Sequence, residues 1–543
     1  MILQRSALVV LLCLAWLLPG LIGHDPWKTE EAYTFGLVLA LLQGGSWIVP
    51  HLAGEAFVAE PPLFHLSAAA SAILFSPILP VHDAARLASG FYIALTLLFC
   101  GLAGRELNGG KQGALTAILL LGCFGLVLRS HQLINDVATL AGFAMAYYGL
   151  ALALRRALAG GFWLGTGLGI VFMTQGLPET AVVAAIAIVL PLAFGAWRNR
   201  NYALALPAAL LAAAPWLAIW PALLHTHSPA LFSTWLWTNN IARFTVSDGA
   251  GLLYYLRILP WYAWPVWALA LWTLWRERAG IPGKPALQLP LIGFLVTLGM
   301  LSATTDAREL YALPLLLPLT LLAAPAISTL RRGAANAWYW FSVMGFTFFI
   351  AVAWFYWSAL ELGFPARLHQ HLHTIRPGYD FGFRWLPFIC ALAYTAAWFA
   401  VLARLRRDPA RPVIVWACGI TAIWALLATL FIGWADTAKS YRSVMTDMAR
   451  ALPKSYNCMS SRDLGEPQRA LLHYYTGIIT HREEVPARRR ECDLLLAQGK
   501  PLDESWLPEY WKQIWEGQRP GDKDERYRLY QRNLEKPGKL KQP

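Results

Sequence analysis

Apolar runs separated by short polar clusters recur along the chain from Leu8 to Ile432. Each run is long enough to cross a hydrocarbon core, which takes roughly 20 helical residues. Because backbone groups in lipid must pair within their own segment, we expect these runs to be helices. The pattern predicts thirteen membrane spans, at about residues 5–23, 84–104, 111–128, 135–155, 160–174, 178–196, 202–222, 257–276, 286–303, 309–330, 337–358, 385–405 and 412–434.

Clusters of Lys and Arg between the runs indicate the orientation, since short cytoplasmic loops carry an excess of positive charge. A cytoplasmic N-terminus puts nearly all of the clusters inside. The inside loops are then Arg105 to Lys111, Arg155/Arg156, Arg198 to Arg200, Arg276 to Lys284, Arg331/Arg332 and Arg404 to Arg411. With an odd number of spans, the C-terminus lies outside the cytoplasm.

Two segments need a separate interpretation. Residues 63–79 are also apolar, but a span there would reverse every later loop, so we expect a helix in the outer interface that breaks near Pro77. The first 23 residues resemble a signal peptide, with Arg5 before an apolar core. Because so many spans follow, we interpret them as an uncleaved membrane anchor.

Composition agrees with an integral membrane protein, since 57% of residues are hydrophobic, 14% are charged and the mean hydropathy is +0.44. The net charge of +13 lies in the loops without a nucleic-acid-binding motif, so no nucleic-acid partner is expected. We expect a transmembrane domain at residues 1–435, with a first outer loop at 24–83 and a long outer loop at 223–256. The charged residues 436–543 form a C-terminal extracytoplasmic domain, which is periplasmic in a bacterial cell.

Seven cysteines divide by location. Five lie inside predicted spans, where we expect packing roles. Cys458 and Cys492 lie in the C-terminal segment, and an oxidising compartment would let them pair, although the sequence leaves open whether they approach each other.

Polar residues gather in the first outer loop, while nucleotide-binding and metal-binding signatures are missing. Thr29 can cap a helix whose first turn holds Glu30 and Glu31, where the helix dipole favours carboxylates. An interfacial helix with an acidic first turn is therefore one interpretation. We also find no internal repeat, which disfavours a transporter built from inverted repeats.

The order of several motifs resembles a known family. Residues 27–62 contain the acidic pair, then Gly-Ser-Trp-Ile-Val-Pro-His at 45–51, then Pro61-Pro62. This segment resembles the first extracytoplasmic loop of the GT-C membrane glycosyltransferases related to lipid A aminoarabinose transferase and protein O-mannosyltransferase. The resemblance continues at Asp136, at residues 240–244 and at residues 311–314.

The resemblance implies an all-α integral membrane protein of GT-C architecture. It implies a glycosyltransferase that moves a sugar from a polyprenyl-phosphate carrier to a lipid, glycan or protein acceptor, with its active site facing the periplasm at the bacterial inner membrane. The family's two catalytic aspartates fall on Glu30 and Asp136, with Glu31 beside them. A helix N-cap is the alternative role for Asp136. Membrane lipids are expected partners, no cofactor is assigned, and a divalent metal stays open.

Some family positions differ in this chain. Glu60 stands where the aminoarabinose branch has Lys, Tyr33 where it has Arg, Asn240 where the family has His, and Gln175 where it often has Lys. With His65, these four residues are the expected substrate cavity. Replacement phosphate-binding groups are Arg243, Arg308, Lys28 and Tyr311.

Each replacement cation has an alternative role. Arg243 could contact lipid headgroups, Arg308 could pair with Asp306 or Glu309, and Lys28 could extend to the membrane interface. Two other functions stay open for the whole chain. One is a non-catalytic lipid-binding or assembly relative, and the other is a transporter.

Overall fold

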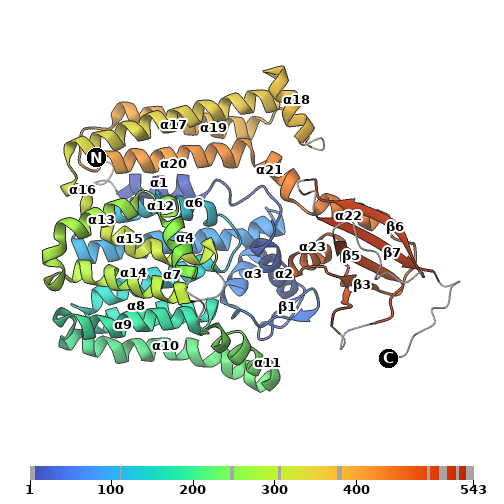
Figure 1. Ribbon diagram of the computed structural model, residues 1–543, viewed down its shortest axis with the longest axis horizontal. Helices are drawn as coiled ribbons and strands as arrows, with labels where there is room; N and C mark the ends of the chain where they lie inside the picture. The colour runs from blue at the N-terminus through green and yellow to red at the C-terminus, as the bar shows by residue number, and fades with distance from the viewer. Residues whose placement is uncertain are drawn as a thin grey trace.

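The computed structural model describes residues 6–110, 112–244, 250–303, 307–375, 379, 382–485, 490–499, 510–520, 522 and 525–533. A bundle of long helices occupies one end of the molecule, and a β-sheet covered by two helices occupies the other (Figure 1). The first outer loop lies between them, so the bundle and the sheet meet at the segment that carries Glu30.

Eight helices in the described part of the chain are long and apolar enough to cross a membrane. Each of them coincides with one of the predicted spans. The eight are α4 (Val81–Asn108), α7 (Asp136–Ala153), α8 (Ala157–Gln175), α10 (Arg200–His227), α14 (Pro285–Ala303), α17 (Arg332–Glu361), α19 (Trp385–Arg404) and α20 (Arg411–Leu430).

Four other predicted spans fall on shorter apolar helices. These are α1 (Ser6–Leu17), α5 (Gln112–Leu121), α9 (Leu177–Ala193), and a 3₁₀ turn (Glu309–Leu315) that continues into α15 (Leu316–Ala323). The predicted loop ends Arg5 and Lys111 lie outside the described residues. Short helices α6 (Phe124–Arg129), α11 (Pro229–Ser233), α16 (Ala326–Thr329) and α18 (Ala366–Ile375) complete the bundle.

The span predicted at residues 257–276 is divided between two helices in the structure. Helix α12 (Ala250–Tyr262) ends before Pro265, and α13 (Val266–Glu277) begins after it. Proline lacks an amide hydrogen and restricts the residue before it, so the apolar run continues while the helix does not. Hydropathy alone carries no signal for this break.

Helix α8 packs between α7 and α10, and glycines at both contacts let the helix backbones approach closely. A Cβ at Gly142 of α7 would lie 2.8 Å from the backbone oxygen of Gly167 in α8. A Cβ at Gly161 of α8 would lie 2.6 Å from the backbone oxygen of Ala205 in α10. Small residues let helices in membranes approach closely enough for dispersion contacts to hold them.

The first outer loop contains α2 (Glu30–Leu42), a short hairpin of β1 (His51–Leu52) and β2 (Glu55–Ala56), and α3 (Leu63–Phe75). Helix α3 ends just before Pro77, where the sequence predicted a break. Its last turn and the following residues expose Ile73, Leu74 and Ile78. Exposed apolar side chains at the end of a short helix are typical of a segment at a membrane interface.

The C-terminal segment is not helical throughout, so the all-α expectation is wrong there. Its sheet has the order β4-β3-β5-β7-β6, with β3 parallel to both neighbours and the other pairs antiparallel. Helices α21 (Ile432–Lys439), α22 (Arg442–Arg450) and α23 (Glu466–Thr476) belong to the same segment. The strands are β3 (Met459–Arg462), β4 (His481–Arg482), β5 (Leu494–Gly499), β6 (Trp511–Gln518) and β7 (Arg526–Arg532).

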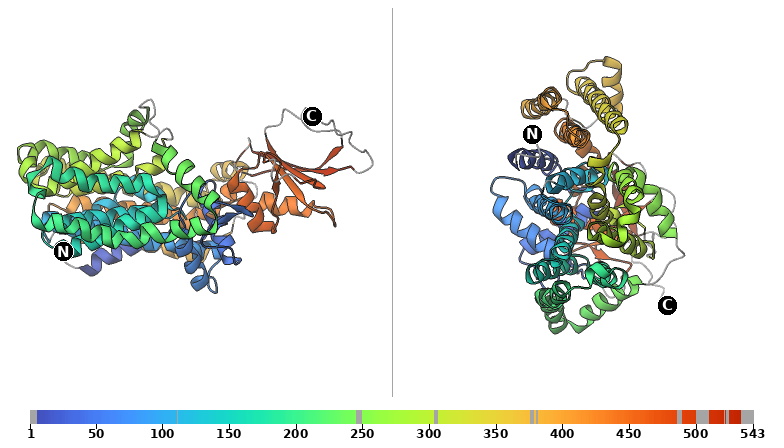
Figure 2. Two further views of the ribbon diagram at one scale, coloured as in Figure 1. Left: turned by 90° about the horizontal axis from the view of Figure 1, so that it is seen from below. Right: turned by 90° about the vertical axis from the view of Figure 1, so that its left-hand side faces the viewer.

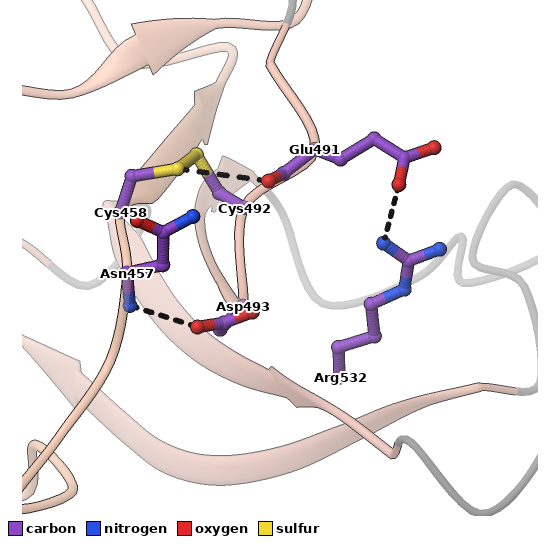
Figure 3. The surroundings of a disulfide bond; sticks show 6 residues. All are labelled: Asn457, Cys458, Glu491, Cys492, Asp493 and Arg532. Carbon is purple, nitrogen blue, oxygen red and sulfur yellow. Dashed lines mark hydrogen bonds and ion pairs between the residues drawn. A yellow bond between two sulfur atoms is a disulfide. The ribbon is translucent and has the colours of Figure 1, made fainter.

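Cys458 and Cys492 form a disulfide at the starts of the parallel strands β3 and β5 (Figure 3). The Asn457 amide donates to the Asp493 carboxylate at 2.8 Å beside it. The covalent link therefore joins two strands that are already neighbours in the sheet.

The C-terminal segment docks on the first outer loop by apolar and charged contacts. Ala32 of α2 belongs to the same buried cluster as Leu471 of α23. Arg469 of α23 pairs with Glu55 of the hairpin at 2.8 Å. Lys28, just before α2, pairs with Glu525. One apolar contact and two ion pairs thus fix the loop against the C-terminal segment.

Candidate active site

Glu30 begins α2 and lies near Arg308. Its carboxylate is 3.9 Å from Arg308, and the neighbouring Glu309 pairs with Arg129. Thr29 is the N-cap residue but makes no side-chain capping bond. Glu30 remains about one quarter exposed. A partly exposed carboxylate with a nearby cation is available to accept a hydrogen bond or a proton.

Glu31 has a different environment from Glu30. It is only 2% exposed and accepts hydrogen bonds from Arg86 at 3.0 Å and from the Leu133 amide at 2.9 Å. Burial would raise the pKa of Glu31, but Arg86 and the other hydrogen-bonding groups hold it below its usual value. The carboxylate thus ties α2 to the segment that leads into α7. Nothing in this geometry leaves Glu31 open to a substrate.

Asp136 is the first residue of α7, and Asn135 occupies the N-cap position. Gln175, the last residue of α8, donates a hydrogen bond to Asp136 at 3.2 Å. The alternative N-cap role for Asp136 therefore falls to its neighbour. Asn135 uses its amide to donate to Glu60 at 2.9 Å, which links the first outer loop to α7.

Glu60 is held by polar groups from three elements. It accepts hydrogen bonds from Asn135 and, at 3.2 Å, from the Tyr33 hydroxyl of α2. The His65 ring of α3 lies 3.9 Å from the carboxylate and is fully buried. Burial raises the pKa of Glu60 to about 7, although its hydrogen bonds oppose the shift. The position is therefore close to half protonated near neutral pH.

A cavity at the same end of the bundle brings together residues from distant parts of the chain. The space in it that a water molecule can enter is about 50 Å³. Its lining includes the polar residues Asp136, Gln175, Glu179, Arg243 and Tyr311. Four of these five were predicted as site residues, and Glu179, in the outer turn between α8 and α9, pairs with Arg243 at 3.1 Å. The predicted base and two predicted phosphate ligands therefore share one space.

Asn240 has a structural role beside this cavity. Its side-chain oxygen accepts from the Leu177 amide at 2.7 Å, and its nitrogen donates to the Trp235 carbonyl at 2.8 Å. The side chain is only 1% exposed. It therefore fixes the turn between α8 and α9, and so the start of the helix that carries Glu179.

Only two of the three predicted phosphate-binding cations lie at the site. Arg243 and Arg308 lie at the site, each near a carboxylate, whereas Lys28 binds Glu525 of the C-terminal segment. The alternative partner Glu309 pairs with Arg129. The other alternative partner for Arg308, Asp306, lies outside the described residues.

Arg129 and Arg86 are site residues that the sequence reasoning missed. Arg129 is one fifth exposed and pairs with Glu309, next to Arg308. Arg86 is fully buried against Glu31 and Asp83. Both lie at the outer ends of predicted spans, where the positive-inside pattern disfavours arginine. The departure of these two arginines from that pattern is the sequence signal that identifies them as candidate site residues.

The arrangement combines carboxylates with guanidinium groups at the end of the bundle nearer the C-terminal sheet. Carboxylates accept protons from hydroxyl groups, and arginines bind phosphate oxygens in a bidentate manner. Within the described ranges, no group of three or more His, Cys, Asp or Glu is placed to share a metal ion. The chemistry that fits is transfer between a hydroxyl group and a phosphate-linked carbon.

Comparison with curated proteins finds relatives described as arabinosyl transferases. The chain is 30% identical over 346 residues to the undecaprenyl phosphate-alpha-4-amino-4-deoxy-L-arabinose arabinosyl transferase of Pectobacterium atrosepticum, covering 60% of each chain. The protein of the same description from Pseudomonas aeruginosa UCBPP-PA14 is 28% identical over 350 residues, 61% of each chain. The chain thus matches about 60% of the length of these relatives. No protein-family model matches it.

Comparison with solved structures supports the same fold. The crystal structure of ArnT from Cupriavidus metallidurans bound to undecaprenyl phosphate matches with a TM-score of 0.69, at 16% identity, over 97% of both chains. Its apo state matches with a TM-score of 0.68. The resemblance to the GT-C glycosyltransferases of the aminoarabinose transferase type is therefore confirmed, in sequence over part of the chain and in fold over nearly all of it.

Proposed function

We propose that this protein is a polyprenyl-phosphate-sugar-dependent glycosyltransferase that acts on a lipid acceptor at the outer face of a bacterial inner membrane. The observation that carries the proposal is the cavity that joins Asp136, Arg243 and Tyr311, with Glu30 and Arg308 paired nearby. The relatives' named activity favours a pentose bearing an amino group as the sugar and undecaprenyl phosphate as the carrier. Lipid A is the favoured acceptor, ahead of a glycan or a protein.

The proposed reaction is a single displacement at the anomeric carbon. Glu30 or Asp136 accepts the proton of the acceptor hydroxyl, whose oxygen forms the new bond to the sugar. The bond between the anomeric carbon and the carrier phosphate breaks, and the phosphate leaves with the bonding electrons. Arg243 and Arg308 stabilise the charge that develops on this phosphate, and Tyr311 donates a hydrogen bond to it.

Cations from elsewhere in the chain support catalysis over a non-catalytic role. The chain lacks the Lys and Arg of the family's first loop, at Glu60 and Tyr33. Arg308, in the segment before α15, lies near Glu30. Arg129 pairs with Glu309, the residue that follows Arg308 in the chain. The charge that the first loop lacks is therefore supplied by two other segments.

The position of the cavity favours a transferase over a transporter. Asp136 begins α7, Gln175 ends α8, and Glu179 lies in the first turn of α9. A transporter places its polar site near the middle of the membrane, where helices are broken. Polar residues at helix ends instead suit an enzyme whose substrates meet at the membrane surface.

The proposed topology has thirteen spans with the site outside the cytoplasm. Helices α2 and α3 lie at the outer interface, and residues 436–543 form a periplasmic domain. Positive charge at Arg332 and Arg411, where α17 and α20 begin, supports a cytoplasmic location for those helix starts. The cavity lies toward the end of the bundle opposite to Arg332 and Arg411, and this position supports the periplasmic orientation of the site.

A transfer assay with a double variant tests the proposed function. The purified full chain in proteoliposomes is given undecaprenyl phosphate-aminoarabinose and lipid A, and modified lipid A is measured by mass spectrometry. We expect Glu30→Gln with Asp136→Asn to reduce turnover by about 10²–10⁴-fold, because general-base catalysis contributes that much. The matched control, Glu106→Gln with Asp408→Asn on the cytoplasmic side, is expected to keep full turnover. Full turnover in the Glu30 and Asp136 variant would exclude the mechanism.

A further inference from the structure

A second, apolar groove lies between α17 and α20, away from the cavity that holds Asp136. The space in it that a water molecule can enter is about 530 Å³. Aromatic and aliphatic side chains form most of its lining, among them Phe349, Tyr356, Trp424 and Phe431. Phe349 and Tyr356 are each roughly half exposed, so the groove is open along its length. A long apolar groove on a membrane-facing surface suits a hydrocarbon chain.

The groove occupies the outer half of these helices. Both helices begin with arginine, at Arg332 and Arg411, and their lining residues lie toward the opposite ends. The lining continues into α21 as far as Lys439. Helix α21 lies between the bundle and the C-terminal sheet (Figure 1). In the proposed topology, a lipid in the groove would belong to the outer leaflet.

A cation and an indole ring close the outer end of the groove. The Lys439 ammonium lies 4.2 Å from the centre of the Trp27 ring, and the Trp27 indole donates to Asp436 at 2.8 Å. Lys439 is exposed and, within the described part of the chain, makes no ion pair. Lysine beside tryptophan at the membrane surface is suited to the phosphate of a lipid headgroup. The end of the groove is thus complementary in charge to an anionic lipid.

The groove and the cavity lie on different sides of the bundle, and Trp27 connects the groove to the loop that carries Glu30. Trp27 is three residues before Glu30 in the same loop. Helices α8 and α9, which line the cavity, lie at the far side of the bundle from α17 and α20 in two perpendicular views (Figures 1 and 2). Two lipids, one in the groove and one in the cavity, would therefore not compete for one site.

We propose that the α17–α20 groove binds the acceptor, a membrane lipid whose phosphorylated headgroup contacts Lys439 while an acyl chain lies between the helices. The inference rests on the proposed function, since it assigns the Asp136 cavity to the donor phosphate. It adds the location and the chemistry of the acceptor site. When the headgroup phosphate contacts Lys439, the sugar hydroxyls of the same headgroup would lie near Glu30.

Native mass spectrometry of lipid binding tests the groove without requiring catalysis. The purified full chain is titrated separately with lipid A, with undecaprenyl phosphate and with phosphatidylglycerol. Lys439→Glu reverses the charge at the outer end, and Ala435→Phe adds bulk to the groove itself. The matched controls are Arg367→Glu, an exposed cation on α18, and Ala397→Phe, an exposed position on α19.

The expected result is a loss of about tenfold or more in lipid A affinity for both groove variants, since a charged headgroup contact and chain contacts are removed. Binding of undecaprenyl phosphate should stay unchanged, and both controls should bind as the unmodified protein does. Equal lipid A binding in both groove variants would overturn the proposal. A loss of undecaprenyl phosphate binding instead, or binding of phosphatidylglycerol in preference to lipid A, would also overturn it. Because turnover is not measured, failure here is distinct from failure of the transferase assignment.

Discussion

At the scale of single residues, adjacent carboxylates have opposite environments. Glu30 is partly exposed near Arg308, whereas Glu31 is buried against Arg86 and the Leu133 amide. The second carboxylate therefore fixes the position of the first relative to α7. The sequence grouped Glu31 with Glu30 and Asp136 as a catalytic candidate, because spacing alone does not reveal which side of a helix faces the bundle.

The pKa of Glu60 provides a test at this scale. Burial raises this pKa to about 7 in the folded protein, so the folded state binds the proton more tightly than the unfolded chain does. The resulting stabilisation is present below the usual carboxyl pKa of about 4.3 and is lost as pH rises through about 7. We expect the thermal unfolding temperature of the protein to fall from pH 5 to pH 8.

Glu60→Gln should reduce this fall, because glutamine does not titrate. The control Glu466→Gln changes an exposed carboxylate at the start of α23 and should leave the profile as it is. If the unfolding temperature fell with pH equally steeply in the Glu60→Gln variant and the unmodified protein, the raised pKa of Glu60 would be contradicted.

Much of the site could be predicted from the sequence, but only through the family resemblance. Asp136, Gln175, Arg243 and Tyr311 lie on four separate segments, and the structure brings them to one cavity. Composition and periodicity contain no information about that convergence. The partner of Lys28 could not be predicted, because Glu525 is 497 positions away in the chain.

At the scale of helices, hydropathy predicted the long spans correctly and missed the breaks within apolar runs. Helix α5 ends at Leu121 and α6 begins at Phe124, although the residues between them are not charged. The Gly122 backbone carbonyl there accepts a hydrogen bond from the Trp416 indole at 2.9 Å. A tertiary contact of this kind satisfies the backbone where the helix stops, and the local sequence does not encode it.

The close packing of α7 on α8 gives a prediction for two glycines. Gly142→Ala would place a methyl group 2.8 Å from the Gly167 backbone oxygen, so the helices must separate. We expect a loss of about 1–3 kcal/mol in the free energy of unfolding, as for overpacked cores.

Gly345 of α17 provides the matched control, because no atom lies within 4 Å of its added Cβ. Gly345→Ala should be neutral or stabilising by up to about 1 kcal/mol, from helix propensity. Thermal unfolding of both variants in the same detergent measures the difference. Equal stability of the two variants would show that α7 and α8 are not packed as closely as described.

At the scale of the whole molecule, the first outer loop joins the bundle to the C-terminal sheet. The sequence predicted a separate C-terminal segment from its composition, but not its strands. Strand β4 has two residues and β3 has four, which is too short for a recognisable alternation. The sheet is built by pairing between distant segments, and local patterns do not specify such pairing.

Asp25 holds the two parts together and gives a prediction. It accepts hydrogen bonds from Arg442 at 2.9 Å and from Ser440 at 2.5 Å, both in the C-terminal segment. We expect Asp25→Ala to speed limited proteolysis near residues 436–442, because the docked segment opens more often. The control Glu491→Ala removes an exposed ion pair with Arg532 within the C-terminal segment and should not change the cleavage rate. Equal rates for both variants would mean that Asp25 does not hold the docking contact.

The central claim is that cations outside the first loop hold a polyprenyl phosphate beside Glu30 and Asp136. Native mass spectrometry of the purified protein, with undecaprenyl phosphate added in a titration, tests it most directly. We predict saturable binding that falls about tenfold or more in an Arg243→Gln, Arg308→Gln variant, because two charge-assisted contacts are lost. Binding should persist in the cytoplasmic control Arg155→Gln, Arg278→Gln. Undiminished binding in the Arg243 and Arg308 variant, or no binding by the unmodified protein, would contradict the account.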